Sequence, residues 1–243
     1  MKDVIFTIQE NTRIAPSTYR MVLEGDTAEI QRPGQFVNIR LDGFFLRRPI
    51  SVCDCEGTLL TIIYKTVGKG TAAMAEMESG FKLSLLTGLG NGYDTQASGD
   101  TPLLVGGGAG VPPMYLLAKK LREEGKQVTV ILGFNAKEEI FFEEEFRSLG
   151  CEVIVTTVDG SYGVKGFVTD GFPEAYSYVY TCGPEPMLKA VYQKAKDGQF
   201  SFEERMGCGF GACMGCSCRT ITGYKRICKD GPILRKGEIL WED

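Results

Sequence analysis

The residues with the clearest chemistry are five cysteines near the C-terminal end, at positions Cys208, Cys213, Cys216, Cys218 and Cys228. The first three follow the spacing C-x4-C-x2-C. Plant-type [2Fe–2S] sites have this spacing and one more distant cysteine. Cys228 follows with eleven residues between it and Cys216, and it can supply the fourth thiolate. We therefore predict a [2Fe–2S] cluster bound by Cys208, Cys213, Cys216 and Cys228.

Cys218 is the cysteine of this group that is hardest to assign. In an extended segment it would share a face with Cys216, so direction alone does not exclude it as a ligand. The plant-type spacing contains no C-x-C step, however. We interpret Cys218 as a free thiol. The neighbouring glycines would let the loop wrap closely around a cluster, because glycine adopts dihedral angles that other residues avoid.

Two other readings of the cysteines are a structural zinc site and a disulfide knot. Zinc sites with four cysteines usually have two pairs of closely spaced ligands, whereas here three cysteines are close together and one stands apart. Disulfides are rare in reducing compartments. The opening segment MKDVIFTIQE does not have the pattern of a signal peptide, so we expect a cytoplasmic protein with reduced thiols. These features favour iron over both alternatives.

Composition narrows the function classes further. The 243 residues carry a net charge of −4, which argues against a nucleic-acid-binding surface. The absence of histidine excludes Ser-His and Cys-His nucleophile pairs and Rieske centres. The most apolar stretch is interrupted by glycines and prolines, so we expect no membrane span.

The first hundred residues predict a small β-barrel. Short runs rich in β-branched and aromatic residues are separated by Gly, Pro and Asp, as in barrels. One short helix is expected from Thr71 to Met77, with Thr71 as its N-cap. The expected strands are Val4–Gln9, Tyr19–Leu23, Gln35–Leu41, Leu59–Tyr64 and 81–87.

From Thr101 onwards strands alternate with helices, which predicts βαβ units and a parallel sheet. Two turns have the layout of strand end, small residues and helix start: VGGGAGVPPM and TCGPEPM. Both turns would lie at the carboxyl ends of strands, where α/β proteins bind nucleotides. The first turn reads G-x-G-x-G, not the usual G-x-G-x-x-G, and a tight turn without a ligand stays open. No arginine follows the second strand to bind a 2′-phosphate, which favours NAD over NADP.

The barrel carries its own candidate anion site. FLRRPISV places two arginines before a proline and a serine, and Gly70 and Thr71 open the short helix. Arginine and a helix N-terminus can each bind a phosphate. A surface Arg-Arg pair is often only a solvated face. Next to a nucleotide-binding sheet, the two features together predict a flavin site.

These motifs together resemble the ferredoxin–NADP reductase superfamily. The resemblance implies that FAD contacts Arg48, Pro49, Ile50, Ser51, Ile63, Tyr64, Lys65, Gly70 and Thr71. It implies that NAD contacts Gly106, Gly107, Gly108, Gly110, Cys182, Gly183 and Pro184, with Cys182 near the nicotinamide. No other catalytic residue is predicted. Many members have tyrosine at the position of Ile50, so ring stacking would be lost here or supplied elsewhere, with Tyr64 as a candidate.

The cysteine tail narrows the resemblance. Six segments together resemble the electron transfer subunits of type B dihydroorotate dehydrogenases. They are FLRRPIS, LVGGGAGVPP, DGSYGVKGFVTD, CGPEPMLKA, EERMGCGFGACMGCSC and KRICKDGP. The resemblance implies a FAD-binding β-barrel over residues 1–98, an NAD-binding α/β domain over 99–200 and a [2Fe–2S] domain over 201–243. It also implies an FMN-containing catalytic partner, in a heterotetramer of two plus two subunits, and electron flow from FMN through the cluster and FAD to NAD+.

Two other functions stay open at this point. Electron-transfer subunits of ferredoxin:NADP or of sulfide and sulfite systems share this body and tail. The other alternative belongs to a different class, a regulatory binding module with a zinc tail and no redox activity.

Overall fold

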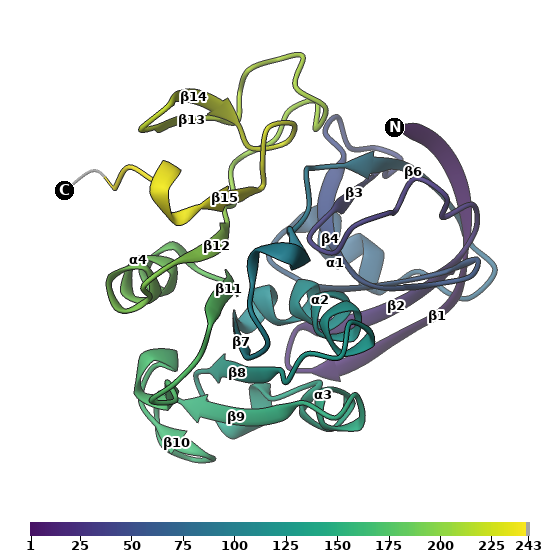
Figure 1. The fold of residues 1–243 in the computed structure, drawn as a ribbon. Coiled ribbons are helices and arrows are strands. Elements are labelled where there is room, and N and C mark those ends of the chain that lie inside the picture. Colours follow the sequence, from purple (N-terminus) through teal and green to yellow (C-terminus); the bar gives the residue numbers. More distant parts are fainter. Residues whose placement is uncertain (242–243) are drawn as a thin grey trace.

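The computed structural model describes residues 1–241 and contains a barrel, a mixed sheet and a cysteine-rich segment (Figure 1). The barrel is closed in the order β1-β2-β5-β4-β3-β6, with α1 (Lys69–Ala75) between β5 and β6. Its strands are β1 (Lys2–Ala15), β2 (Thr18–Glu24), β3 (Phe36–Ile39), β4 (Arg48–Glu56), β5 (Leu59–Lys65) and β6 (Lys82–Leu89). The predicted barrel is therefore confirmed.

The helix of the barrel begins earlier than predicted. Gly68 is its N-cap residue and Lys69 its first residue, so Thr71 lies in the first turn and is not the N-cap. The Thr71 hydroxyl reaches back and accepts bonds from the main-chain N–H groups of Val67 and Gly68, at 3.0 and 3.3 Å. The threonine thus stabilises the helix start from inside the helix.

The second sheet has the order β10-β9-β8-β7-β11-β12-β15, and its first six strands run parallel. The strands are β7 (Pro102–Gly107), β8 (Thr129–Phe134), β9 (Glu152–Thr157), β10 (Val164–Lys165), β11 (Tyr178–Cys182), β12 (Gly198–Ser201) and β15 (Ile233–Arg235). Its helices are α2 (Val111–Glu123), α3 (Glu143–Ser148) and α4 (Glu185–Lys194). The short 3-10 turns are Thr95–Ala97, Gly108–Gly110, Lys137–Glu139, Val168–Gly171 and Lys236–Glu238. The predicted parallel α/β sheet is confirmed.

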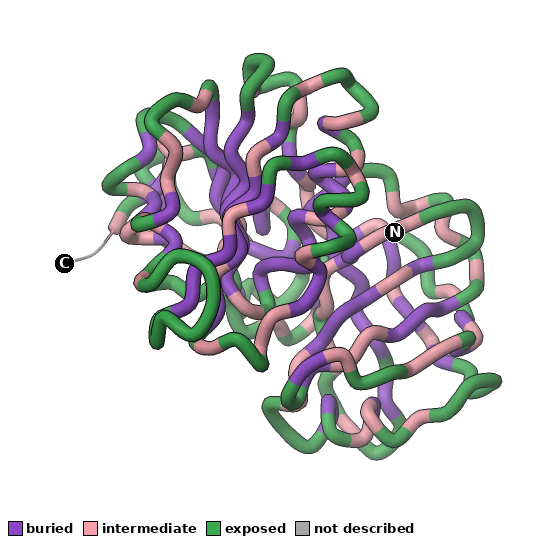
Figure 2. Tube along the Cα trace, turned by 90° about the horizontal axis from the view of Figure 1, so that it is seen from below, coloured by how far each residue is buried: buried purple, intermediate pink, exposed green. Residues whose placement is uncertain are grey.

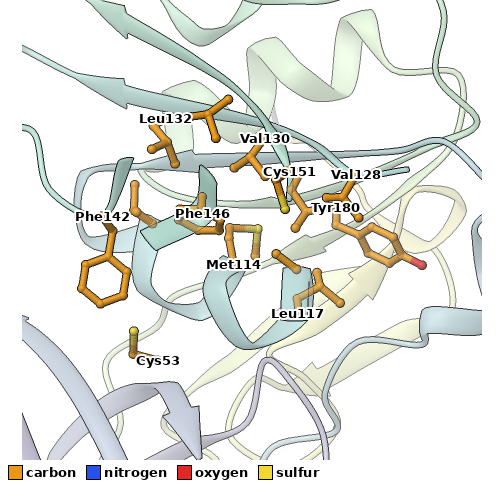
Figure 3. Packing of buried hydrophobic residues seen from close by; sticks show 14 of the residues in the cluster. Cys53, Met114, Leu117, Val128, Val130, Leu132, Phe142, Phe146, Cys151 and Tyr180 are labelled. Carbon is orange, nitrogen blue, oxygen red and sulfur yellow. The ribbon is translucent and has the colours of Figure 1, made fainter. Parts of the chain in front are cut away.

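Helix α2 joins the sheet to the barrel. Its apolar residues recur every three or four positions, and Met114, Leu117 and Leu121 are fully buried. They form one core with Leu104 and Val130 of the sheet (Figure 3). Cys53 of β4 closes this core from the barrel side. An ion pair of 3.3 Å between Lys119 and Asp54 lies at the same junction.

The C-terminal segment is not an isolated appendage. It contains a hairpin of β13 (Ser217–Thr220) and β14 (Gly223–Arg226), and then β15, which pairs antiparallel with β12 at the edge of the main sheet. A second core combines Phe36 and Leu89 of the barrel with Val105 of the sheet and with Cys216 and Cys228. One core therefore contains residues of all three parts. Buried stretches alternate with exposed ones along the chain (Figure 2). No helix within residues 1–241 is long and apolar enough to cross a membrane.

Candidate functional site

The arginine of the barrel motif lies against the start of α1. A Cβ atom added at Gly70 would lie 2.2 Å from Nε of Arg48 and 2.7 Å from its Cζ, so the guanidinium rests directly on this glycine. Arg48 also lies over the ring of Phe44, at 4.9 Å from its centroid, and donates a hydrogen bond to the carbonyl of Leu46. A cation and the first-turn N–H groups of a helix thus converge, an arrangement that suits the pyrophosphate of a dinucleotide.

The other predicted flavin contacts lie on two adjacent strands. Arg48, Pro49, Ile50 and Ser51 open β4, and Ile63, Tyr64 and Lys65 close β5. The ring of Tyr64 is only 3% exposed, stacks on Tyr19 at 5.7 Å and donates from its hydroxyl to Asn11 at 2.9 Å. Burial raises the pKa of Tyr64 to about 12. An enclosed ring leaves its main chain as the part of Tyr64 that could face a cofactor.

The two glycine turns of the sheet meet at the carboxyl ends of adjacent parallel strands. Cys182 of β11 pairs with Gly106 of β7. A Cβ atom at Gly110 would lie 2.1 Å from the carbonyl oxygen of Cys182 and 2.6 Å from the main-chain nitrogen of Gly183. A Cβ atom at Gly107 would lie 2.4 Å from Sδ of Met187. These glycines allow the turns to touch and to form the kind of main-chain edge on which nucleotides bind.

Two side chains frame this edge. Burial raises the pKa of Cys182 to about 12, so the side chain is a neutral thiol at physiological pH. Lys65 of the barrel reaches the glycine turn, with its Nζ 3.9 Å from the position of a Cβ at Gly108, and lies 3.6 Å from a carboxylate oxygen of Glu139. The barrel thus contributes a cation to this edge of the sheet.

The cysteine loop surrounds one sulfur with donors. Sγ of Cys208 accepts hydrogen bonds from the main-chain N–H groups of Phe210, Ala212 and Cys213, at 3.5, 3.2 and 3.5 Å. Burial opposes ionisation of this thiol, but the N–H donors outweigh it and lower the pKa of Cys208 to about 6. Gly209 and Gly211 have φ angles of +80° and +90°, which let the loop curl around the sulfur. A thiolate held by N–H donors suits an iron–sulfur ligand.

The four predicted cluster ligands form two pairs. Cys208 and Cys213 interact on the outer side, whereas Cys216 and Cys228 interact in the core and are 2% and 1% exposed. The main-chain N–H of Cys228 donates to Sγ of Cys216 at 3.4 Å. Among residues 1–241, no three cysteine or carboxylate side chains are arranged to hold a single metal ion. The four predicted ligands therefore lie in one region and can supply the four thiolates that a [2Fe–2S] cluster needs.

Cys218 packs against the core that contains Cys216 and Cys228. It is on β13 opposite Lys225 and lines a cavity of about 870 Å³. The same cavity is lined by Pro49 of β4, by Gly183 of the TCGPEPM turn and by Met206, which precedes the first predicted cluster ligand. The cavity therefore touches all three predicted cofactor regions.

Two residues that support the site were missed in the sequence. Arg226 forms an ion pair of 2.9 Å with Asp230 and donates to the carbonyl of Gly211 at 3.0 Å, so it braces the cysteine loop. Met187 packs against both glycine turns. Both residues fall within motifs that the sequence analysis identified, Arg226 in KRICKDGP and Met187 at the end of TCGPEPM, but their contacts could not be read from those motifs.

Comparisons with known proteins agree with this geometry. Residues 203–240 match the family model for the iron–sulfur cluster binding domain of dihydroorotate dehydrogenase B. Residues 104–193 match the oxidoreductase NAD-binding domain. A solved NADH-dependent reduced ferredoxin–NADP oxidoreductase is 31% identical, with a TM-score of 0.87 over 97% of this chain and 90% of that one. A ferredoxin NADP+ reductase from Neisseria gonorrhoeae, 17% identical with a TM-score of 0.67 over 79% of this chain and 90% of that one, shares the fold.

Curated relatives cover nearly the whole chain. The dihydroorotate dehydrogenase B (NAD(+)) electron transfer subunit of Fusobacterium nucleatum is 45% identical over 96% of both chains. The subunit of the same name from a Geobacillus species is 44% identical over 99% of both. Both relatives thus match this chain over at least 96% of its length. The chain therefore belongs to the family of dihydroorotate dehydrogenase B (NAD(+)) electron transfer subunits.

Proposed function

We propose that this chain passes electrons from an FMN-bearing catalytic subunit through a [2Fe–2S] cluster and FAD to NAD+. The observation that carries the proposal is the cavity of about 870 Å³ that Pro49, Gly183 and Met206 line together. A flavin exchanges hydride with a nicotinamide and single electrons with a cluster, so the three carriers have to be adjacent. The cavity offers one place where the three predicted sites adjoin.

The chain's own residues would hold and orient these groups. Arg48, Gly70 and Thr71 would take the FAD pyrophosphate, and Pro49 to Ser51 would lie along the isoalloxazine. Gly106 to Gly110 and Cys182 to Pro184 would bind NAD(H). Hydride transfer needs no histidine base, which agrees with a sequence that has none.

The cluster would be held with one thiol pair on each iron. Cys208 and Cys213 would bind the outer iron, and Cys216 and Cys228 the inner one. Cys218 would stay a free thiol. The outer pair includes the exposed Cys213, which would put the cluster close to the surface that meets the partner.

The partner we propose is the FMN-containing catalytic subunit, in an assembly of two plus two chains. The printed name of the relatives, electron transfer subunit, supports a partner of this kind. All nine cysteines are free thiols, which supports a reducing compartment such as the cytoplasm.

The experiment is to copurify the chain with its catalytic subunit and to measure iron, sulfide, flavin and dihydroorotate:NAD+ activity. A Cys213→Ser variant should lose iron and should still reduce its FAD with NADH, but FAD should no longer be reduced by dihydroorotate. The matched Cys218→Ser variant should retain iron. Normal reduction of FAD by dihydroorotate in a Cys213→Ser variant without cluster would refute the proposed order of carriers.

A second role is favoured by one observation, the 31% identity to the NADH-dependent reduced ferredoxin–NADP oxidoreductase. In that case the chain would transfer electrons between a nicotinamide and a ferredoxin. NADH-dependent reduction of ferredoxin, without any copurifying FMN subunit, would support this role.

A further inference from the structure

Asn38 is a polar side chain buried where the barrel meets the cysteine loop. It lies within β3 and is 1% exposed. Its neighbours along the strand belong to two different cores. Val37 and Ile39 point into the barrel core. Phe36, on the other face of the strand, packs in the core that contains Cys216 and Cys228. Asn38 shares the face of Phe36, because alternate residues of a strand point the same way.

The side chain of Asn38 contacts the cluster loop directly. Its Nδ2 donates to the carbonyl oxygen of Cys208 at 3.4 Å. A Cβ atom at Gly209 would lie 2.4 Å from that same Nδ2, so the glycine is what lets the loop approach the amide. The first cluster cysteine is therefore held against the barrel by one side chain.

The main chain of Asn38 contacts the flavin strand. Asn38 is paired with Pro49 in the ladder between β3 and β4. Its carbonyl accepts a hydrogen bond from Nη1 of Arg47 at 3.2 Å. Asn38 therefore contacts the cysteine loop through its side chain and the start of β4 through its main chain.

The polarity of Asn38 needs an explanation, because an apolar residue would suit a position beside Phe36. Its Oδ1 has no hydrogen-bond partner within residues 1–241. An unpaired buried acceptor destabilises a fold. The hydrogen bond that the amide donates to the Cys208 carbonyl is the contact that an apolar residue at this position could not make.

We propose that Asn38 is a positioning residue for electron transfer between the cluster and FAD, because it fixes the Cys208 loop against β4, the strand that opens with the predicted flavin contacts Arg48 to Ser51. The inference rests on the proposed function. Residues that hold metal ligands through hydrogen bonds change affinity or activity about 10- to 100-fold when they are replaced. We expect a change toward the lower end of this range, because Asn38 holds the main chain of a ligand rather than its sulfur.

The test uses the chain loaded with FAD and cluster and compares Asn38→Leu with Asn38→Asp. Leucine keeps the volume without the donor, and aspartate keeps the shape but turns an acceptor toward the Cys208 carbonyl. The matched control is Thr87→Val, which removes a buried side-chain bond to a main-chain carbonyl, 3.2 Å long, on the neighbouring strand β6. Anaerobic stopped-flow measurements with NADH follow flavin reduction first and bleaching of the cluster second. Electron paramagnetic resonance of the reduced cluster gives a readout that does not depend on turnover.

Both Asn38 variants should reduce their flavin at the wild-type rate and then reduce the cluster about 10-fold more slowly. Their resonance spectra should be shifted or broadened, and Thr87→Val should match the wild type in both readouts. Wild-type transfer rates and spectra in both Asn38 variants would overturn the inference and leave the proposed function standing. Equal slowing in Thr87→Val would also overturn it, since general loosening would then be the cause. A wild-type chain that binds no iron would remove the proposed function and this inference together.

Discussion

Replacement of Gly110 by alanine tests the nucleotide-binding edge most sharply. The new Cβ would lie 2.1 Å from the carbonyl oxygen of Cys182, a main-chain atom that no side-chain rotation can move away. Restoring an ordinary contact of 3.4 Å would need a shift of 1.3 Å between the two turns. Gly110 itself has ordinary helical dihedrals, with φ of −86°, so the effect would come from crowding and not from backbone strain.

The size of the effect follows from that crowding. Added atoms in a well-packed site destabilise it by about 1–3 kcal/mol. If the strain falls on the NADH-bound form, the dissociation constant for NADH should rise about 5- to 150-fold. Electron delivery from the partner to FAD does not use this edge and should be unchanged.

The assay is anaerobic titration of flavin reduction by NADH, followed by flavin absorbance. Gly237→Ala is the control, because a Cβ atom there meets no atom within 4 Å. A Gly110→Ala variant that binds NADH as tightly as the wild type would refute the assignment of the two turns to the nucleotide.

Three further predictions concern the supports of the site. Arg48→Leu should release FAD during gel filtration because the pyrophosphate would lose its cation, measured as the flavin-to-protein absorbance ratio, with Arg13→Leu as a surface control. Asn91→Ala should lower the free energy of unfolding by about 1–3 kcal/mol in urea titrations, since the Asn91 side chain bonds the main chain of Asp230 and both main-chain groups of Ile233; an unchanged midpoint would contradict it. Burial by itself would raise the pKa of Asp3. The Ser84 hydroxyl and the Arg47 guanidinium stabilise the carboxylate more strongly, so the pKa of Asp3 lies below its usual value. Ionised Asp3 therefore stabilises the fold above about pH 4, and this contribution is lost as the pH falls through the lowered pKa. The melting temperature of Asp3→Asn should accordingly fall less steeply in acid than that of the wild type.

Local patterns predicted the parts of the fold that rest on neighbouring residues. The alternation of strands and helices after Thr101 gave the parallel sheet, because hydrophobic periodicity and turn residues act within one element. The barrel was predictable for the same reason. The start of α1 was misplaced because Gly68 occupies the cap position, while Thr71 forms its bonds from the third helical position.

Long-range polar contacts could not be predicted from the sequence. Asn38 reaches a carbonyl 170 positions away, and Asn91 reaches carbonyls 139 and 142 positions away. Every residue type has a main-chain carbonyl, so such a partner leaves no mark in the sequence. The pairing of β15 with the edge of the main sheet could not be predicted for a different reason. A strand of three residues is too short for its hydrophobic periodicity to be recognised.

The way the tail is built into the sheet leads to a prediction about iron removal. Cys216 and Cys228 are buried in the same core as Phe36 of the barrel, Phe200 of β12 and Leu234 of β15. Metal binding contributes to folding free energy when the ligands form part of a core. The loss of iron should therefore loosen the edge of the main sheet, and not only the cysteine loop.

Hydrogen exchange measured with and without iron would detect this. The amides of β12 and β15 should exchange faster in the iron-free chain, because Phe200 and Leu234 are paired and lie in the same core as the buried cysteines. Those of β8 and β9, at the other side of β7, should keep their protection and serve as an internal control. Unchanged exchange at β12 and β15 would mean that the sheet edge is stable by itself, and that the two buried thiols are held by the fold before any iron arrives.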